Sequence, residues 1–156
     1  MKTKKSWIEK LHDNKDLPKV VKIEGKMSTR WGTGTCAIPA PIEVNEIMRR
    51  VPKGKLITIN QIREIVAKKH KANIGCPITT GIFAWISAGA AEEERARGKK
   101  DITPYWRTLK GEEELNPKYP LGIKFQKEIL ENEGHKVMQK GKKFFVENYQ
   151  EKLIVV

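Results

Sequence analysis

The order of apolar and polar positions predicts two short helices after residue 40. The first has an apolar stripe with the spacing i, i+3, i+4, i+7, formed by Val44, Ile47, Met48 and Val51. Residues 52–54, Pro-Lys-Gly, end it. In the second, Thr58 is the expected N-cap and Gln61 completes a capping box. The inner face of this second helix is Ile59, Ile62, Ile65 and Val66.

A third helix is predicted to begin at Pro77 and to run to about Arg97. Residues 73–75 before it read as a turn, and Gly98 follows its end. Its large apolar residues are Ile78, Ile82, Phe83, Trp85 and Ile86. Two helices, a short turn and a third helix are typical of a helix-turn-helix unit.

The C-terminal part predicts one more helix and a hairpin. Leu121, Phe125 and Ile129 step by four along a helix that Gly134 closes. Residues 136–139 and 143–146 flank Lys140-Gly141-Lys142, a pattern typical of a basic β-hairpin. Helices followed by a two-stranded wing favour a mainly α fold, a winged helix-turn-helix DNA-binding domain.

Residues 1–40 read as a basic N-terminal extension, followed by a domain at 41–156. Residues 6–11 predict a short helix and 17–23 a strand, whereas 28–35 are turn-rich. Pro39 and Pro41 mark the boundary. The first five residues are basic but lead into no apolar signal core, so we expect a cytoplasmic protein.

The charge balance points to a polyanionic partner. Lys and Arg number 31 against 19 acidic residues in 156, a formal net charge of +12 spread along the chain. Such a field favours the phosphate backbone of nucleic acid, although a soluble protein with a lysine-rich surface has the same composition. No apolar run is long enough to cross a membrane.

Metal and thiol chemistry is poorly represented in the sequence. Cys36 and Cys76 are lone thiols, and the three histidines are widely scattered. No spacing typical of a zinc site occurs, so we expect no metal and no cofactor.

Four segments resemble, in the same order, motifs of the DNA-binding domain of the alkylguanine-DNA alkyltransferase family, over about residues 42–137. Residues 47–54 resemble the helix and Pro-x-Gly turn before the helix-turn-helix, and 58–62 resemble its Thr-Tyr-Gly-Gln-Ile motif. Residues 104–107, Pro-Tyr-Trp-Arg, stand at the place of the active-site Pro-Cys-His-Arg. Residues 122–135 resemble the closing helix with its Glu-Gly-His end.

The resemblance implies an active site that has lost its chemistry. In the family a cysteine thiolate accepts an alkyl group from a guanine oxygen, with a histidine as base and a carboxylate to orient it. Here Tyr105 replaces the cysteine and Trp106 the histidine, so that only Glu133 remains of the relay. A phenol with a pKa near 10 is a poor nucleophile without a base beside it. We expect no catalytic residue at these degenerate positions.

The resemblance also implies where DNA would bind. The family extrudes the damaged nucleotide with an arginine of its recognition helix, and Thr80 is nearest to that position here. The family's phosphate-side tyrosine corresponds to Ile59. Pro104, Tyr105 and Trp106 would form a base pocket. The expected DNA-binding residues are Thr58, Asn60, Thr79, Thr80, Gly81, Phe83, Arg107, Lys140, Lys142 and Lys143.

We therefore expect a monomeric, non-catalytic protein that binds double-stranded DNA. Alkyltransferase-like proteins, in which another residue replaces the acceptor cysteine, bind alkylated DNA and mark it for excision repair. The resemblance to them implies sensing of alkylated guanine, with repair proteins as partners. Tyr105 and Trp106 would either stack a flipped base or fill the pocket as core residues.

Two other interpretations remain open. Cys76 precedes Pro77 at a helix start, where the dipole lowers a thiol pKa, and this displaced cysteine would accept the alkyl group in a methylated-DNA alkyltransferase. Alternatively, the chain is a protein-interaction module in which Trp7 and Trp31 cover the old DNA face. DNA binding that weakens steeply with added salt separates the DNA-binding interpretation from this last one.

Overall fold

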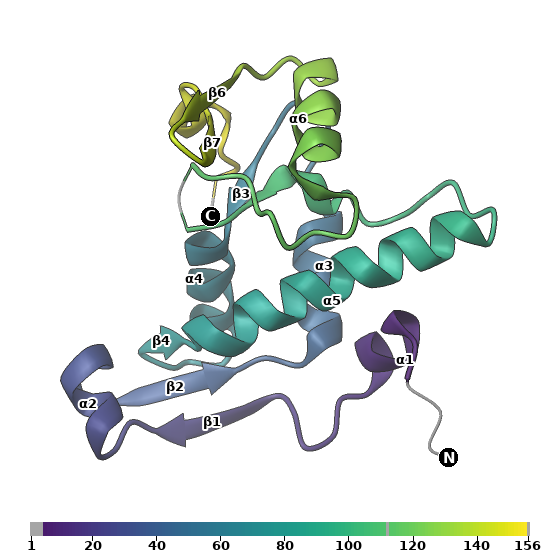
Figure 1. Ribbon diagram of the computed structural model, residues 1–156. Helices are drawn as coiled ribbons and strands as arrows, with labels where there is room; N and C mark the ends of the chain where they lie inside the picture. The colour runs from purple at the N-terminus through teal and green to yellow at the C-terminus, as the bar shows by residue number, and fades with distance from the viewer. Residues whose placement is uncertain (1–4, 112, 156) are drawn as a thin grey trace.

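The computed structural model describes residues 5–111 and 113–155, in which helices pack together with three small sheets (Figure 1). Residues 1–4 of the basic start, residue 112 and residue 156 lie outside the described part. The helices are α1 (Trp7–His12), α2 (Lys26–Trp31), α3 (Pro41–Arg49), α4 (Ile59–Lys69), α5 (Pro77–Ala96) and α6 (Gly122–Asn132), with 3-10 turns η1 (Tyr105–Arg107) and η2 (Tyr149–Lys152). The strands are β1 (Lys19–Lys22), β2 (Thr35–Ile38), β3 (Ile57–Thr58), β4 (Ile74–Gly75), β5 (Thr108–Leu109), β6 (Val137–Lys140) and β7 (Lys143–Val146). No helix in these ranges is both long and apolar enough to cross a membrane.

The predicted capping box at the start of α4 is confirmed. The Thr58 hydroxyl accepts the backbone N–H of Gln61 at 3.1 Å. The Gln61 side chain in turn accepts the backbone N–H of Thr58 at 3.1 Å. Both donors would otherwise lack a partner at the first turn, so the pair fixes where α4 begins.

The predicted third helix is α5, which crosses the whole molecule in Figure 1. Of its large apolar residues, Ile86 is buried and Phe83 partly buried in the small core beneath α1. Ile78, Ile82 and Trp85 are 52%, 44% and 39% exposed. The face that meets α3, α4 and η1 carries small residues instead, namely Thr80, Ala84, Ser87, Ala88 and Ala91. Short side chains let the neighbouring helices approach the α5 backbone closely.

The sheets make the fold mixed α and β, whereas the sequence predicts a mainly helical domain. β2 pairs antiparallel with β1 and parallel with β4, and β3 pairs parallel with β5. Residues 73–75 read as a turn, yet Ile74 and Gly75 pair with Cys36 and Ala37. The predicted strand over residues 17–23 is confirmed as β1, whereas β2, β3, β4 and β5 have only two to four residues and pair with partners distant in sequence or read as turn formers, so local sequence patterns do not reveal them. The predicted basic hairpin is confirmed as β6 and β7, with Val137 opposite Val146.

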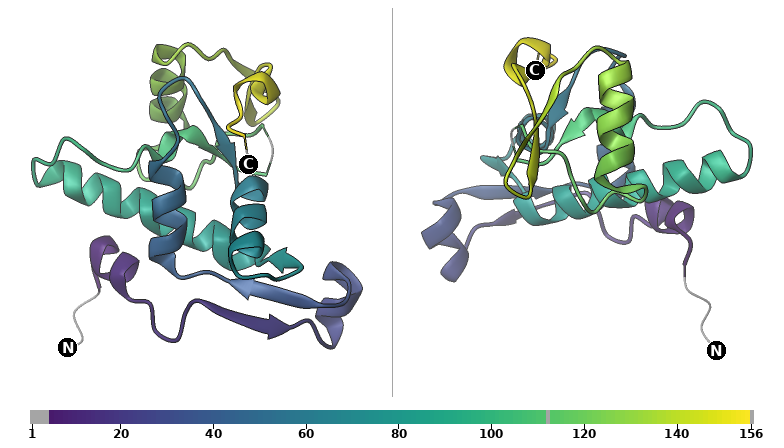
Figure 2. Two further views of the ribbon diagram at one scale, coloured as in Figure 1. Left: turned by 180° about the vertical axis from the view of Figure 1, so that it is seen from behind. Right: turned by 45° about the horizontal axis from the view of Figure 1, so that its top comes forward.

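The N-terminal residues contact the rest of the molecule through α1, which meets α5 and α3, and through β2, which meets β4 and α4. α1 is the predicted short helix, and it packs on the middle of α5 (Figure 2). Leu11, Ile86 and Ala90 form a small separate core there. The Trp7 ring lies against Gly89 and meets the Trp85 ring edge-on at 4.6 Å between centroids. The second contact is the pairing of β2 with β4.

Gly89 is expected to be required by the Trp7 ring. A Cβ atom at position 89 would collide with that ring, so Gly89→Ala should lower the free energy of unfolding by about 1–2 kcal/mol through overpacking. In a Trp7→Ala background the clash is absent, and the same change should stabilise the protein by up to about 1 kcal/mol through helix propensity. Urea denaturation of the four proteins measures both effects. An equal effect of Gly89→Ala in both backgrounds would contradict this packing.

Candidate nucleic-acid interface

Tyr105, which the sequence resemblance places at the family's acceptor position, is fully buried. Its hydroxyl donates to Glu92 Oε2 of α5 at 2.6 Å. Its ring lies 5.2 Å from Tyr119 and 5.4 Å from Trp106, both edge-on. Burial raises the pKa of Tyr105 far above its ordinary value, and the Glu92 carboxylate raises it further. A phenol that stays protonated and surrounded by side chains has no access to a substrate.

Glu133 joins the end of α6 to η1 and to the turn after α3. Its carboxylate accepts Trp106 Nε1 at 3.0 Å, Arg107 Nε at 2.9 Å and Arg107 Nη2 at 2.8 Å. Arg107 Nη1 also donates to the Val51 carbonyl at 2.7 Å. The two side chains are only 6% and 13% exposed. Burial by itself would raise the pKa of Glu133, but the hydrogen bonds from Arg107 and Trp106 outweigh it and hold that pKa below its usual range.

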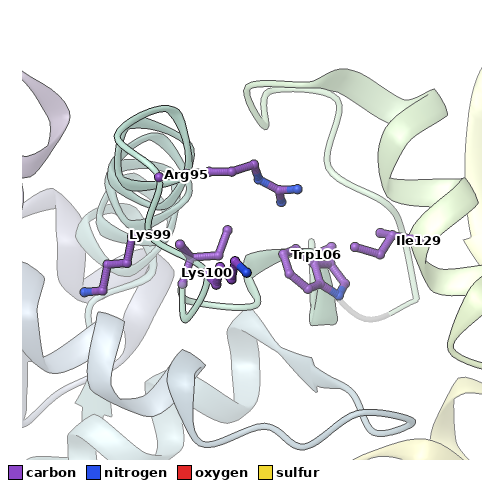
Figure 3. Close-up of a pocket in the computed structure, with 7 residues that line it drawn as sticks. Arg95, Lys99, Lys100, Trp106 and Ile129 are labelled. Carbon is purple, nitrogen blue, oxygen red and sulfur yellow. The ribbon is translucent and has the colours of Figure 1, made fainter.

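The predicted base-pocket residues lie in the core or at its edge. Pro104, Tyr105 and Trp106 are all buried, and Trp106 also lines a shallow pocket of about 370 Å³. Figure 3 shows Trp106 and Ile129 facing Arg95 and Lys100 across this space, with Lys99 turned away. The Arg95 guanidinium is already paired with Glu92 and lies over the Phe125 ring. Because Arg95 and Gly98 line it, the pocket lies at the C-terminal end of α5.

A larger groove, which we call the α5 groove, lies along the N-terminal half of the same helix. Its volume is about 670 Å³, and most of its wall is apolar. The lining residues are Ile59, Pro77, Ile78, Gly81, Ile82, Trp85, Lys110, Gly111, Asn116 and Lys118. The sequence interpretation did not identify this site. The spacing i, i+4, i+7 of Ile78, Ile82 and Trp85 is the signal that could have indicated it, since it marks an apolar stripe apart from the alanine face.

The predicted DNA-binding residues of α4 and α5 have different surroundings. Gly81 lines the groove, whereas Thr80 is fully buried and Phe83 packs partly against the core. Within the described residues, the buried hydroxyls of Thr79 and Thr80 have no hydrogen-bond partner. The Thr58 hydroxyl is used by the capping box. Asn60 is exposed, and its side-chain oxygen accepts Arg63 Nη1 at 3.1 Å.

The other predicted DNA-binding residues lie away from the groove floor. Lys140, Lys142 and Lys143 are exposed at the tip of the β6–β7 hairpin. Arg107 is held in its ion pair with Glu133. The structure thus brings Gly81 close to lysines that the sequence interpretation left out, Lys110 and Lys118.

Both cysteines are free thiols buried below the start of α5. Cys76 is the N-cap residue, and its Sγ accepts the backbone N–H of Thr79 at 3.5 Å. Burial raises the pKa of Cys36 to about 11, with a smaller contribution from Cys76. Trp31 packs on the same cluster. Throughout residues 5–111 and 113–155, no three His, Cys, Asp or Glu side chains come together as a metal site would require.

His135 ends the Glu-Gly-His segment, and its side chain is 6% exposed. Neither ring nitrogen has a hydrogen-bond partner in the part of the chain that the structure describes. Desolvation lowers the pKa of His135 below 6.5, and the positive charges of Lys152 and Arg107 act in the same direction, against the attraction of Glu133. His135 is therefore a neutral core residue near neutral pH.

Replacing Glu133 is expected to cost far more stability than replacing an exposed glutamate of the same helix. Glu133→Gln leaves the buried guanidinium of Arg107 without its counter-charge, which costs about 3–5 kcal/mol of unfolding free energy. Glu128→Gln, at an exposed position of α6, serves as the control and should change stability by less than about 0.5 kcal/mol. Chemical denaturation of the three proteins gives the comparison. Similar losses for both variants would show that the ion pair is not needed.

His135 should make the protein less stable in mild acid. Because its pKa is lower in the folded than in the unfolded chain, the unfolded state takes up a proton first as the pH falls. The destabilisation by His135 is absent above about pH 6.5, and it grows progressively as the pH falls below that value. His135→Leu removes this loss, so the stability difference between variant and wild type should shift in favour of the variant between pH 7.5 and 5. Urea midpoints across this range test it, and parallel pH curves would refute the assignment.

Comparison with known proteins agrees with the sequence resemblance at the level of the fold. No protein-family model matches the sequence. No curated protein matches it either. The structure is similar to S. pombe Atl1 in complex with damaged DNA containing O6-carboxymethylguanine, with a TM-score of 0.55, 18% identity, and coverage of 74% of this chain and 94% of that one. A second S. pombe ATL structure in complex with DNA gives a TM-score of 0.54, with the same identity and coverage. The chain therefore has the fold of the alkyltransferase-like proteins.

Proposed function

We propose that this protein binds double-stranded DNA without catalysing a reaction, and that it senses alkylated guanine in the α5 groove. The observation that carries this proposal is a fold shared with a DNA-bound protein, combined with a buried side chain at the expected acceptor position. The fold extends over 94% of an Atl1 chain that was determined with damaged DNA. Tyr105, which the sequence resemblance places at the acceptor position, is buried and hydrogen-bonded to Glu92.

Charge supports DNA as the ligand. The net charge of +12 draws the chain toward phosphates, and Lys110 and Lys118 stand at the rim of an otherwise apolar groove. Lys140, Lys142 and Lys143 are exposed on the hairpin, which we propose as the wing of a winged helix. Phosphate contacts of this kind would position the duplex, and the groove would contact the bases.

The α5 groove supports recognition of a base by apolar contact. Ile59, which the sequence resemblance aligns with the family's phosphate-side tyrosine, and Ile82 both line it. Proteins that bind the minor groove often insert isoleucine or similar wedges between base steps. Trp85 offers an indole ring on which an exposed base can stack. The groove thus takes the role that the sequence interpretation gives to Pro104, Tyr105 and Trp106.

Acceptor chemistry has little support in the positions of the candidate nucleophiles. The Tyr105 hydroxyl is held by Glu92, and the Cys76 thiol lies in a buried cluster with Cys36 and Ile23. Neither residue lines the α5 groove. An electrophilic alkyl group in the groove would reach neither side chain without a rearrangement of the core.

The test is fluorescence anisotropy with a plain duplex and with one that carries a single O6-methylguanine, at two salt concentrations. We expect salt-sensitive binding that is tighter for the methylated duplex. Ile82→Gln should weaken the methylated complex roughly tenfold, because burial of an isoleucine side chain against a base is worth about 1.5–3 kcal/mol when it is complete. Leu121→Gln is the matched control, since Leu121 is similarly exposed but lies outside the groove.

Each result has a separate meaning. Equal affinity for the two duplexes would reject damage sensing and leave general DNA binding. Absence of binding would overturn the proposal and favour the protein-interaction module, for which an apolar groove is also suitable. A mass increase of one alkyl group after incubation with the methylated duplex would reject the non-catalytic assignment.

A further inference from the structure

Residues 19–38 form a projection that we call the basic arm, built from β1, α2 and β2. It extends beyond the start of α5 and lies at the opposite end of the molecule from the turn that follows α5 (Figure 1). The view from behind shows the same arrangement (Figure 2). Its exposed basic residues are Lys19, Lys22, Lys26 and Arg30, and Glu24 is its exposed acidic residue.

The basic arm is firmly joined to the first turn of α5. Ala37 accepts the backbone N–H of Cys76, the α5 N-cap, at 2.9 Å. The Asn73 side chain accepts the backbone N–H of Thr35 at 2.8 Å, and the Asn73 N–H donates to the Thr35 carbonyl at 3.1 Å. Gly34 makes room for that side chain, because a Cβ atom there would collide with it. The position of the arm is therefore set relative to the α5 groove.

β1 itself adds little to the core. All four of its residues are exposed, including Val20 and Val21, so neither face of the strand is covered. It is held by its backbone pairing with β2 and by Ile23, which is buried directly after it. A strand that buries nothing on either face is not explained by packing.

The charges of the arm are mostly uncompensated. Lys19 forms an exposed pair with Asp16 at 2.9 Å. Across the described ranges, no acidic side chain forms an ion pair with Lys22, Lys26 or Arg30. Like charges held close together repel one another, and this repulsion raises the free energy of the unbound protein. Binding to a polyanion relieves the repulsion and releases the counterions that had condensed on the polyanion.

We propose that the basic arm is a second DNA-contacting element, in which Lys22, Lys26 and Arg30 bind the phosphate backbone beside the segment held by the α5 groove. This inference rests on the proposed DNA-binding function. The arm adds affinity independent of base sequence, because its contacts are to phosphates. Its rigid connection to Cys76 and Asn73 keeps those contacts at a fixed distance from the groove.

The experiment measures the salt dependence of duplex binding by the full chain. Each phosphate contact contributes about 0.9 to the slope of log K against log salt, so K22A/K26A/R30A should reduce that slope by roughly 2.7. The matched control is R97A/K99A/K100A, which removes the same charge from exposed positions at the other end of the molecule. It should leave the slope within about 0.5 of the wild-type value. K22R/K26R keeps both charges and should retain the wild-type slope.

The outcomes distinguish this inference from the function on which it rests. If wild type binds duplex but the arm variant and its control have equal slopes, the basic arm is not a DNA contact, while the proposed function stands. If wild type binds no duplex, both proposals fail together. All variants change exposed residues, and circular dichroism melts that match wild type assign the lost slope to lost contacts.

Discussion

The close approach of other elements to the small-residue face of α5 is the constraint on which the rest of the structure depends. Ala84, Ala88 and Ala91 allow α3, α4 and η1 to share one helix as their packing surface, and Gly89 admits Trp7 of α1 on another side. With the core side occupied by short side chains, the large apolar residues Ile78 and Ile82 remain at the surface. The small residues on one face of α5 allow the core to pack closely, and the large apolar residues on another face form the wall of the α5 groove.

The second organising feature is a buried carboxylate. Glu133 satisfies Arg107 and Trp106 at once, and Arg107 extends the network to Val51. The family resemblance gives this glutamate a part in activating a nucleophile, through a histidine. In this chain the same carboxylate closes the fold around η1, and an aromatic cluster occupies the space beside it. The charge interactions of Glu133, which in the family would support catalysis, stabilise the packing around η1 in this chain.

Local patterns were sufficient for some elements and insufficient for others. The capping box of Thr58, the helix from Pro77 and the basic hairpin each depend on residues close in sequence, and each is confirmed. The strands β2 and β4 and the helix α2 were missed, because their partners are distant or their residues read as turn formers. The α5 groove was missed for a related reason, since a helical periodicity shows that residues share a face but not which face meets the core.

The pairing of β2 with β4 and the packing of Trp7 on Gly89 also bear on how the chain acquires its structure. Residues 7–38 are synthesised before their partners at 74–90. Contacts between such distant segments form slowly, because the loop between them must first close. The N-terminal part is thus synthesised before the segments that complete its packing, and during that interval the apolar side chains of Trp7 and Leu11 lack the α5 residues that cover them in the folded chain.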